Sequence, residues 1–191
     1  SYKGWKQMEI SLAGSYQIIN AALALEGVMA LRALGWQLTD EQVRSGLLAT
    51  KWRGRFTVIG EHPTVIMDGA HNPAAAQTLK DSLEHYFPDQ KLHFIFGMFK
   101  DKDYHEVIRL TAPLAEDIVT VETPGNPRAL PAQELAEAVY PVNPHVRAAK
   151  TVEEAVSEVL DEAKEDDAVI IFGSLSYLGE AERAMKNRGK N

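Results

Sequence analysis

The hydrophobic and polar positions after residue 52 follow two alternating patterns. Short apolar runs are typical of buried strands, and longer segments with apolar positions every three or four residues are typical of helices. The predicted strands are residues 56–59, 65–67, 92–96, 117–121 and 168–172, with a sixth candidate at 145–148. The predicted helices are residues 73–86, 104–114, 131–140, 152–164 and 179–186. Strands and helices therefore alternate along this part of the chain.

This alternation predicts an α/β fold. Parallel strands need a crossover long enough to hold a helix, so the pattern favours a mostly parallel, Rossmann-like sheet of about six strands with helices on both faces. Capping signals mark three helix starts, at Asn72-Pro73, at Leu130-Pro131 and at Thr151. Sheets of this kind bind ligands at the carboxyl ends of their strands, so functional residues are expected there.

The first 51 residues follow a different pattern. Residues 5–12 alternate apolar and polar positions like the end of a strand, and residues 21–34 predict an apolar helix that ends at Gly35. A second helix is predicted after Thr39, because Thr39 and Gln42 have the spacing of a capping box.

Two helices and one strand cannot enclose a core of their own. We therefore expect residues 1–51 to be the tail of another domain whose earlier part is not in this chain. Residues 52–191 then form one α/β domain, a size within the range of about 100–200 residues that is usual for a domain.

Composition and charge exclude several function classes. The formal net charge is −7 and no cluster of five or more basic residues occurs, so nucleic-acid binding is not expected. The absence of cysteine rules out disulfides, thiolate catalysis and Cys-ligated zinc. No apolar run approaches the roughly 18–20 residues of a membrane span, so no membrane partner is expected and a cytoplasmic location is predicted.

The strongest chemical signal is VIMDGAHNP at residues 65–73. A buried strand ends at Asp68, two small residues allow a tight turn, and Asn72 is placed to cap a helix that begins at Pro73. Asp68 and His71 are then presented beside a helix amino terminus, where anionic groups bind. The alternative is that Asp68 and Asn72 only cap and that His71 is a polar turn residue.

Three further positions carry groups suited to an anionic ligand. Arg55 lies in WRGR at residues 52–55, and an arginine can bind a phosphate through two hydrogen bonds, although the segment also fits a solvated linker. Asn20 lies in GSYQIINAA at residues 14–22 and is placed to bond a base, a phosphate or a neighbouring backbone group. Ser174 follows the last predicted strand and offers a hydroxyl at the sheet's edge.

Other devices for binding phosphates and metals are missing or open to two interpretations. The chain has no GxxxxGK[ST] loop, so it cannot cradle nucleotide phosphates in that way. The KDKD loop at residues 100–103 is either a solvated turn or an anion contact through Lys100 or Lys102. The histidines other than His71 show no metal-ligand spacing, so no metal site is predicted in this chain.

The order and spacing of these segments are more specific than any one of them. In chain order they are GSYQIINAA (14–22), WRGRF (52–56), DGAHNP (68–73) and KDKD (100–103). Together they resemble the carboxyl-terminal part of folylpolyglutamate synthase, including its bifunctional dihydrofolate synthase form, in the ATP-dependent Mur ligase superfamily. The likeness covers about residues 13–177. The compact DGAHNP and KDKD forms favour this folate branch over the Mur peptidoglycan ligases, which usually carry one more residue before AHNP.

The resemblance implies a reaction and its partners. Such a ligase joins L-glutamate to the γ-carboxylate of a folate, or to dihydropteroate, through an acyl phosphate made with ATP and Mg²⁺. The parent enzyme is expected to be a monomer. Family members also use an amino-terminal domain that supplies the phosphate-cradling loop and most Mg²⁺ ligands, and neither feature is found here. We therefore expect residues 1–51 to be the end of the central ATP-binding domain, and the chain alone to be inactive.

The resemblance also assigns roles to single residues. Asn20, Arg55 and Asp68 correspond to contacts with ATP. His71, as a catalytic and substrate-binding residue, and Ser174, as a substrate-binding residue, correspond to positions associated with the incoming glutamate or with closure of the site.

The sequence departs from the family pattern at two places. Tyr16 stands where a histidine commonly precedes the glutamine, and Ser176 interrupts the usual Ser-Leu-Tyr-Leu run. Two other hypotheses stay open at this point. One is a fragment of a Mur-type ligase for peptidoglycan precursors, and the other is a stand-alone, non-catalytic ligand-binding domain.

Overall fold

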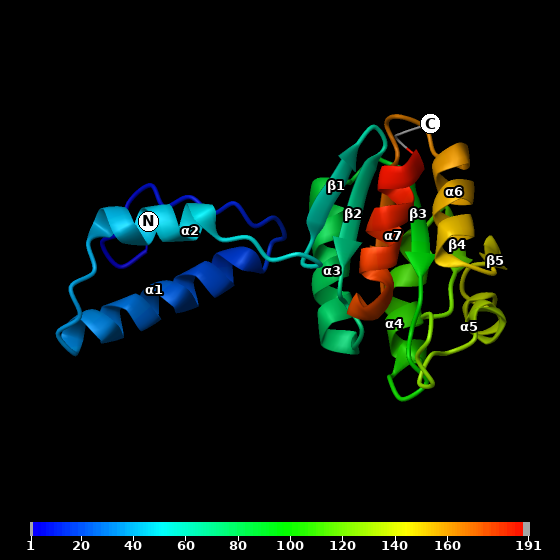
Figure 1. The fold of residues 1–191 in the computed structure, drawn as a ribbon, viewed down its shortest axis with the longest axis horizontal. Coiled ribbons are helices and arrows are strands. Elements are labelled where there is room, and N and C mark those ends of the chain that lie inside the picture. The colour runs from blue at the N-terminus through cyan, green and yellow to red at the C-terminus, as the bar shows by residue number, and fades with distance from the viewer. Residues whose placement is uncertain (1, 189–191) are drawn as a thin grey trace.

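The computed structural model describes residues 2–188 and shows two parts, which are joined near residue 52 (Figure 1). The amino-terminal part contains α1 (Gln17–Ala33) and α2 (Asp40–Ala49). Its small core is formed by Trp5, Leu25 and Val43, which are all buried. The predicted capping box is confirmed, because the Thr39 and Gln42 side chains each accept a hydrogen bond from the other's backbone N–H.

The strand predicted at residues 5–12 is wrong. Within residues 2–188, this segment forms only an isolated bridge between Tyr2 and Trp5. A strand needs a neighbour to pair its backbone groups, and no other strand lies beside it here. The apolar positions of the segment are used differently, since Trp5 and Met8 pack against the helices.

The second part contains six strands and five α-helices within the described residues. The strands are β1 (Thr57–Glu61), β2 (Thr64–Asp68), β3 (Leu92–Phe96), β4 (Asp117–Thr120), β5 (Val146–Ala148) and β6 (Ala168–Phe172). The helices are α3 (Pro73–Tyr86), α4 (Tyr104–Thr111) with the short 3₁₀ helix η1 (Ala112–Leu114), α5 (Ala132–Val139), α6 (Val152–Glu162) and α7 (Leu175–Arg188). Every predicted strand and helix of this part is confirmed, with ends that shift by a few residues.

Two of the helix starts differ from the sequence prediction. α7 begins at Leu175 rather than at Gly179, because Tyr177 and Leu178 are needed as buried contacts in its first turn. Pro131 precedes α5 at its N-cap position and makes no side-chain capping bond, so the signal marks the helix start without capping it. Asn72 and Thr151 do cap, each accepting a hydrogen bond from the backbone three residues on.

The sheet has the strand order β1-β2-β6-β3-β4-β5. β1 pairs antiparallel with β2, and all the other neighbouring strands are parallel. The expected mostly parallel α/β sheet is therefore confirmed. No helix within residues 2–188 is long and apolar enough to span a membrane.

Helices cover both faces of the sheet, because its central strands are apolar on both sides. On β6, Ile170 and Phe172 join a core with α3, α4 and α5, while Val169 and Ile171 join a second core with α6 and α7. All four side chains are at most 1% exposed. Burying each of them contributes about 1.5–3 kcal/mol, so β6 anchors the two layers together.

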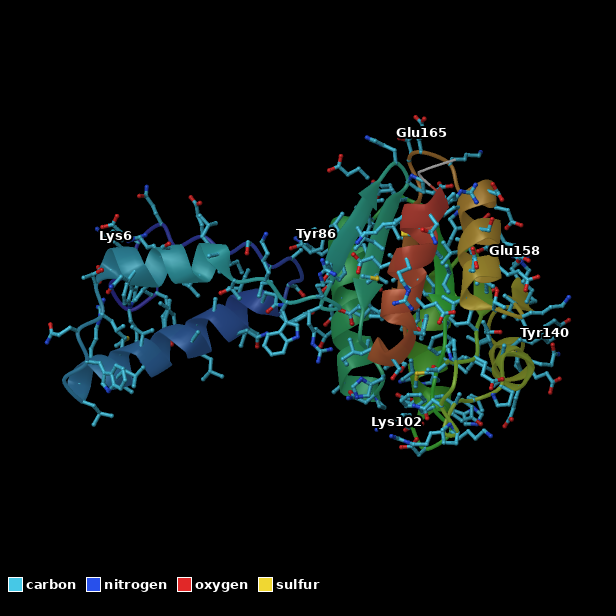
Figure 2. All side chains as sticks on the ribbon, viewed as in Figure 1. Lys6, Tyr86, Lys102, Tyr140, Glu158 and Glu165 are labelled. Carbon is cyan, nitrogen blue, oxygen red and sulfur yellow. The ribbon has the colours of Figure 1, made fainter. Side chains whose placement is uncertain are left out.

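At the amino-terminal ends of the strands, His93 of β3 contacts Asp117 of β4 and Asp167, which lies just before β6. We call this group the histidine clamp. The His93 ring lies 3.2 Å from an oxygen of Asp117 through Nδ1 and 3.2 Å from an oxygen of Asp167 through Nε2. His93 is 5% exposed, and its hydrogen bond to Asp117 raises the pKa of its imidazole. Figure 2 shows Glu165, just before β6, and Lys102, just after β3, at opposite ends of this part. The clamp is therefore remote from the carboxyl ends of the strands.

The carboxyl ends of β3 and β6 approach each other so closely that a side chain has no room. Gly173 follows β6 with φ +109°, and a Cβ atom there would overlap the carbonyl oxygen of Gly97, which follows β3. The Gly97 N–H also donates to the Phe172 carbonyl, at 3.3 Å. Glycine at residue 173 is thus required both by its backbone angle and by its neighbour.

We expect Gly173→Ala to lower the free energy of unfolding by about 2–5 kcal/mol, because a left-handed backbone strain and an overlap with a backbone carbonyl add together. Gly125→Ala is the matched control, since Gly125 has φ +65° and a Cβ atom there would meet no neighbour within 4 Å. The control should lose only about 1–2 kcal/mol. Urea unfolding of both variants measures the difference, and equal losses would contradict the close packing.

We expect His93→Gln to destabilise the fold by about 1–3 kcal/mol at about pH 6, because charged hydrogen bonds to two aspartates are lost. The folded-state pKa of His93 is raised, so its stabilisation is complete below the unfolded value of about 6.5 and is lost as pH rises through the folded value.

The measurement is urea unfolding of the wild type and His93→Gln at about pH 6 and at about pH 9, on either side of the ordinary histidine pKa. The difference in stability should shrink at the higher pH. His145→Gln, at an exposed position, is the control and should change little. A difference that stays constant with pH would show that His93 acts without its charge.

Candidate functional site

Asp68 ends β2 and is more buried than His71, the other predicted site residue of this segment. Its Oδ1 accepts a hydrogen bond from the Ala70 N–H at 2.8 Å, and its Oδ2 accepts one from the Phe56 N–H at 2.8 Å. The Tyr16 hydroxyl donates to the same Oδ2 at 3.4 Å. The side chain is only 5% exposed. Asp68 therefore links the strand end, the segment before β1 and the amino-terminal part.

The electrostatics of Asp68 reflect two opposing effects. Burial raises the pKa of its carboxyl, because the charged form loses its water. The amide hydrogen bonds from Phe56 and Ala70 and the nearby charge of Arg55 favour the charged form but do not cancel that rise. Asp68 is not the cap of α3, because Asn72 accepts the capping bond from Ala75 at 2.9 Å.

The Arg55 guanidinium lies over the turn that follows Asp68. A Cβ atom at Gly69 would come within 2.8 Å of Arg55 Nη1, so the missing side chain makes room for the guanidinium. The Gly69 N–H donates to the Gly54 carbonyl at 2.8 Å and fixes this segment against β2. Among the described residues Arg55 makes no side-chain hydrogen bond or ion pair, whereas Arg53 pairs with Glu182 at 3.3 Å. Arg55 is thus a partly buried cation suited to an anion.

His71 and Ser174 lie at the same edge of the sheet. The ring nitrogen Nδ1 of His71 donates to the Gly69 carbonyl at 2.7 Å, which leaves Nε2 as the ring nitrogen that can contact a ligand. Ser174 follows β6, the parallel neighbour of β2, and Asp68 is paired with Phe172. The Ser174 hydroxyl is buried and accepts from the Ser176 N–H at 3.3 Å.

Asn20 does not touch the other predicted site residues. It is exposed on α1, and its Nδ2 donates to Gln17 at 2.9 Å. Asn20 lines a cavity of about 310 Å³, and Arg55 lines a second cavity of about 350 Å³. The two cavities share the lining residues Leu12, Thr50 and Trp52. Asn20 and Arg55 therefore face adjoining hollows at the junction between the two parts.

Two of the charges in the KDKD loop are used by the fold itself. Asp101 accepts two hydrogen bonds from the Arg128 guanidinium, at 2.6 and 3.1 Å. Asp103 caps α4 by accepting from the Glu106 N–H at 3.2 Å. Lys102 also lies 3.8 Å from Asp101, so among the described residues Lys100 is the one lysine of the loop without an ion pair.

Contacts across the junction were not foreseen from the sequence. Besides the bond from Tyr16 to Asp68, the Ser15 hydroxyl lies 3.1 Å from the hydroxyl of Ser82, a fully buried serine of α3. The Tyr86 side chain, labelled in Figure 2, also lies on the side of the α/β part that faces α1 and α2. Its ring lies 5.4 Å from that of Phe56. These pairs are dozens of residues apart, and no local pattern reveals them.

No group of three or more His, Asp or Glu side chains within residues 2–188 is arranged to hold a metal ion. The site is therefore built from a buried carboxylate, a guanidinium, an imidazole and hydroxyl groups. It lies at the carboxyl edge of a parallel sheet and at the amino terminus of α3, both of which favour anionic ligands.

Comparison with known proteins shows the family to which this sequence is similar. The family model "Mur ligase, glutamate ligase domain" matches residues 54–175. A folylpolyglutamate synthase from Lacticaseibacillus casei is 35% identical over 186 residues, which cover 96% of this chain and 41% of that protein. A dihydrofolate synthase/folylpolyglutamate synthase from Bacillus subtilis is 28% identical over 96% of this chain and 42% of its own length.

Solved structures give the same result. The Escherichia coli FolC structure in complex with DHPP and ADP matches 97% of this chain with a TM-score of 0.84 and 26% identity, and 42% of that chain is covered. A Mycobacterium tuberculosis folylpolyglutamate synthase complexed with ADP and AMPPCP matches 96% of this chain with a TM-score of 0.82 and 30% identity, and 42% of that chain is covered.

The chain spans about two fifths of the length of these relatives. Its matched residues include the whole edge of the sheet described above. The chain therefore belongs to the Mur ligase family and contains the carboxyl-terminal domain of the folylpolyglutamate synthase and dihydrofolate synthase type.

Proposed function

We propose that this chain is the carboxyl-terminal part of an ATP-dependent ligase that adds L-glutamate to the γ-carboxylate of a folate, and that dihydropteroate is a second acceptor. The observation that carries the proposal is the unpartnered Arg55 guanidinium, held over Gly69 beside the buried Asp68. This pair of opposite charges lies at an edge of the sheet suited to a phosphate-bearing ligand. Related structures hold ADP, or AMPPNP with Mn, which supports a nucleotide as a ligand of this family.

In this proposal Arg55, Asp68 and Asn20 contact different parts of the nucleotide. Arg55 binds the phosphates and offsets the negative charge that builds up during phosphoryl transfer. Asp68 accepts a hydrogen bond from a hydroxyl or amine group of the nucleotide, and Asn20 bonds it from the facing cavity. When bound, ATP supplies the phosphoryl group that activates the acceptor's carboxylate.

The same proposal assigns His71 and Ser174 to the incoming glutamate. The His71 ring is fixed through Nδ1 on the Gly69 carbonyl, so Nε2 is oriented to accept a proton from the glutamate amine. The Ser174 hydroxyl, on the neighbouring strand, is placed to donate to a glutamate carboxylate. The amino terminus of α3 adds its partial positive charge to the same edge.

We further propose that residues 1–51 are the end of a central ATP-binding domain and that residues 52–191 form the carboxyl-terminal domain. The apolar face of α1 supports the assignment of residues 1–51 to a larger domain, because Ile18, Ile19 and Leu23 are each about 70% exposed. Such a face is usual where another protein surface covers it. We propose that the remaining part of the ligase supplies the Mg²⁺ ligands, and no step is assigned to the metal within this chain.

In the ligase that carries this chain, we expect Arg55→Ala to lower kcat/KM for ATP about 100- to 1,000-fold, or about 2.7–4 kcal/mol, because a preorganised donor to the transferring phosphoryl group is lost. Arg53→Ala is the matched control, because Arg53 is two residues away and already paired with Glu182. It should retain most of the activity. Glutamate-dependent ADP release measures both variants.

The same assay distinguishes the acceptor. Folate or dihydropteroate should support ADP release, and a muropeptide should not. Unchanged efficiency of Arg55→Ala would remove Arg55 from the site, and turnover of the muropeptide alone would point to a peptidoglycan-precursor ligase.

We expect the 191-residue chain alone to form no ligation product, because it contains no GxxxxGK[ST] loop to hold the nucleotide phosphates. Incubation with ATP, Mg²⁺, glutamate and dihydropteroate, followed by mass spectrometry of the pterin products, measures this. The full-length dihydrofolate synthase/folylpolyglutamate synthase from Bacillus subtilis is the positive control. Steady product formation by the short chain would show that the proposed division of the active site is wrong.

A further inference from the structure

Tyr16 is the only side chain of the described residues that donates to the Asp68 carboxylate. The two other donors, Phe56 and Ala70, are backbone amides whose positions follow from the fold. The phenol comes from the opposite part of the molecule, at the start of α1, and bonds Oδ2 at 3.4 Å. Tyr16 takes the N-cap position of α1, yet its side chain makes no capping bond. The side chain is thus committed to Asp68 instead of to its own helix.

The surroundings hold the Tyr16 ring in place. Gly14 has φ +103°, and a Cβ atom there would come within 2.9 Å of Tyr16 Cε1 and 3.3 Å of Phe56 Cβ. Ser15, the next residue, is bonded to Ser82 through its N–H at 3.3 Å and its hydroxyl at 3.1 Å. The turn before α1 therefore presses the ring against the segment that also bonds Asp68.

The phenol is fit to act as a donor at neutral pH. Burial and the negative charge of Asp68 raise the pKa of Tyr16 well above its ordinary value, while Arg55 opposes the rise. The Tyr16 hydroxyl therefore keeps its proton at neutral pH. A protonated donor favours the charged form of the Asp68 carboxylate, which burial disfavours.

We propose that Tyr16 is a positioning residue that orients the Asp68 carboxylate for contact with the nucleotide. This rests on the proposed role of Asp68 as a nucleotide contact. Tyr16 does not react. It fixes Oδ2 from the side of α1, so that the two parts of the molecule must be in register before Asp68 can accept a bond from the ligand.

The experiment uses the ligase that carries this chain and its variant Tyr16→Phe, which keeps the ring and removes the donor. Tyr140→Phe is the matched control, because Tyr140 is 62% exposed and lies on the side of the α/β part opposite α1 and α2 (Figure 2). Carbon-13 NMR of the Asp68 carboxyl carbon follows its titration. A second titration with ADP follows the shifts of the Arg55 and Asp68 resonances, and thermal melting checks the fold.

We expect Tyr16→Phe to move the Asp68 titration to higher pH and to weaken ADP binding roughly threefold to tenfold, the effect of one lost hydrogen bond. The control should match the wild type in both. An unchanged Asp68 titration, or ADP binding that is unchanged or tighter in Tyr16→Phe, would overturn the role of Tyr16. Separately, the absence of ADP-induced shifts at Arg55 and Asp68 in the wild type would count against the proposed function, while the Asp68 titration still decides whether Tyr16 orients it.

Discussion

A buried carboxylate needs hydrogen-bond donors for its oxygens. At Asp68 this need links the amino-terminal helical part to the α/β part. An unbonded carboxylate in an interior of low dielectric constant costs several kcal/mol. Asp68 meets the requirement with donors from three segments that are distant in the sequence: the turn after β2, the residues before β1 and the start of α1. The same bonds place Arg55 over Gly69 and align the cavities at the junction. A structural need and the proposed ligand contact thus meet in one side chain.

The two edges of the sheet have separate tasks. At the amino edge, the His93 clamp pairs its charges internally and leaves nothing for a ligand. At the carboxyl-terminal ends of the strands, the glycines after β3 and β6 let backbones approach closely, and the glycine after β2 leaves room for the Arg55 side chain. Arg53 and Arg55 repeat this contrast within three residues, since the first is paired by the fold and the second is not.

Most of the α/β fold could be predicted from the sequence because its signals are local. The bounds of α3, β3 and β6 follow directly from periodicity and from the cap at Asn72. The pattern at residues 5–12 misled because alternation indicates a strand only where a partner exists. Asp68, Arg55 and His71 could be selected from motif and resemblance, and the structure brings them to one turn, whereas Asn20 faces a separate cavity. The roles of Tyr16 and His93 depend on partners at least 24 residues away, and no spacing rule finds such partners.

The two bonds to Asp68 Oδ2 close the chain on itself. The backbone leaves that oxygen at Tyr16, passes through α1 and α2, and returns to it at Phe56. The helical segment is therefore a loop with both ends tied to one atom. Since the entropy of closing a loop grows only with the logarithm of its length, by about 0.6 kcal/mol for each doubling, residues added between α1 and α2 would cost little. The helical part could thus gain residues at little cost in stability while the geometry at Asp68 stays the same.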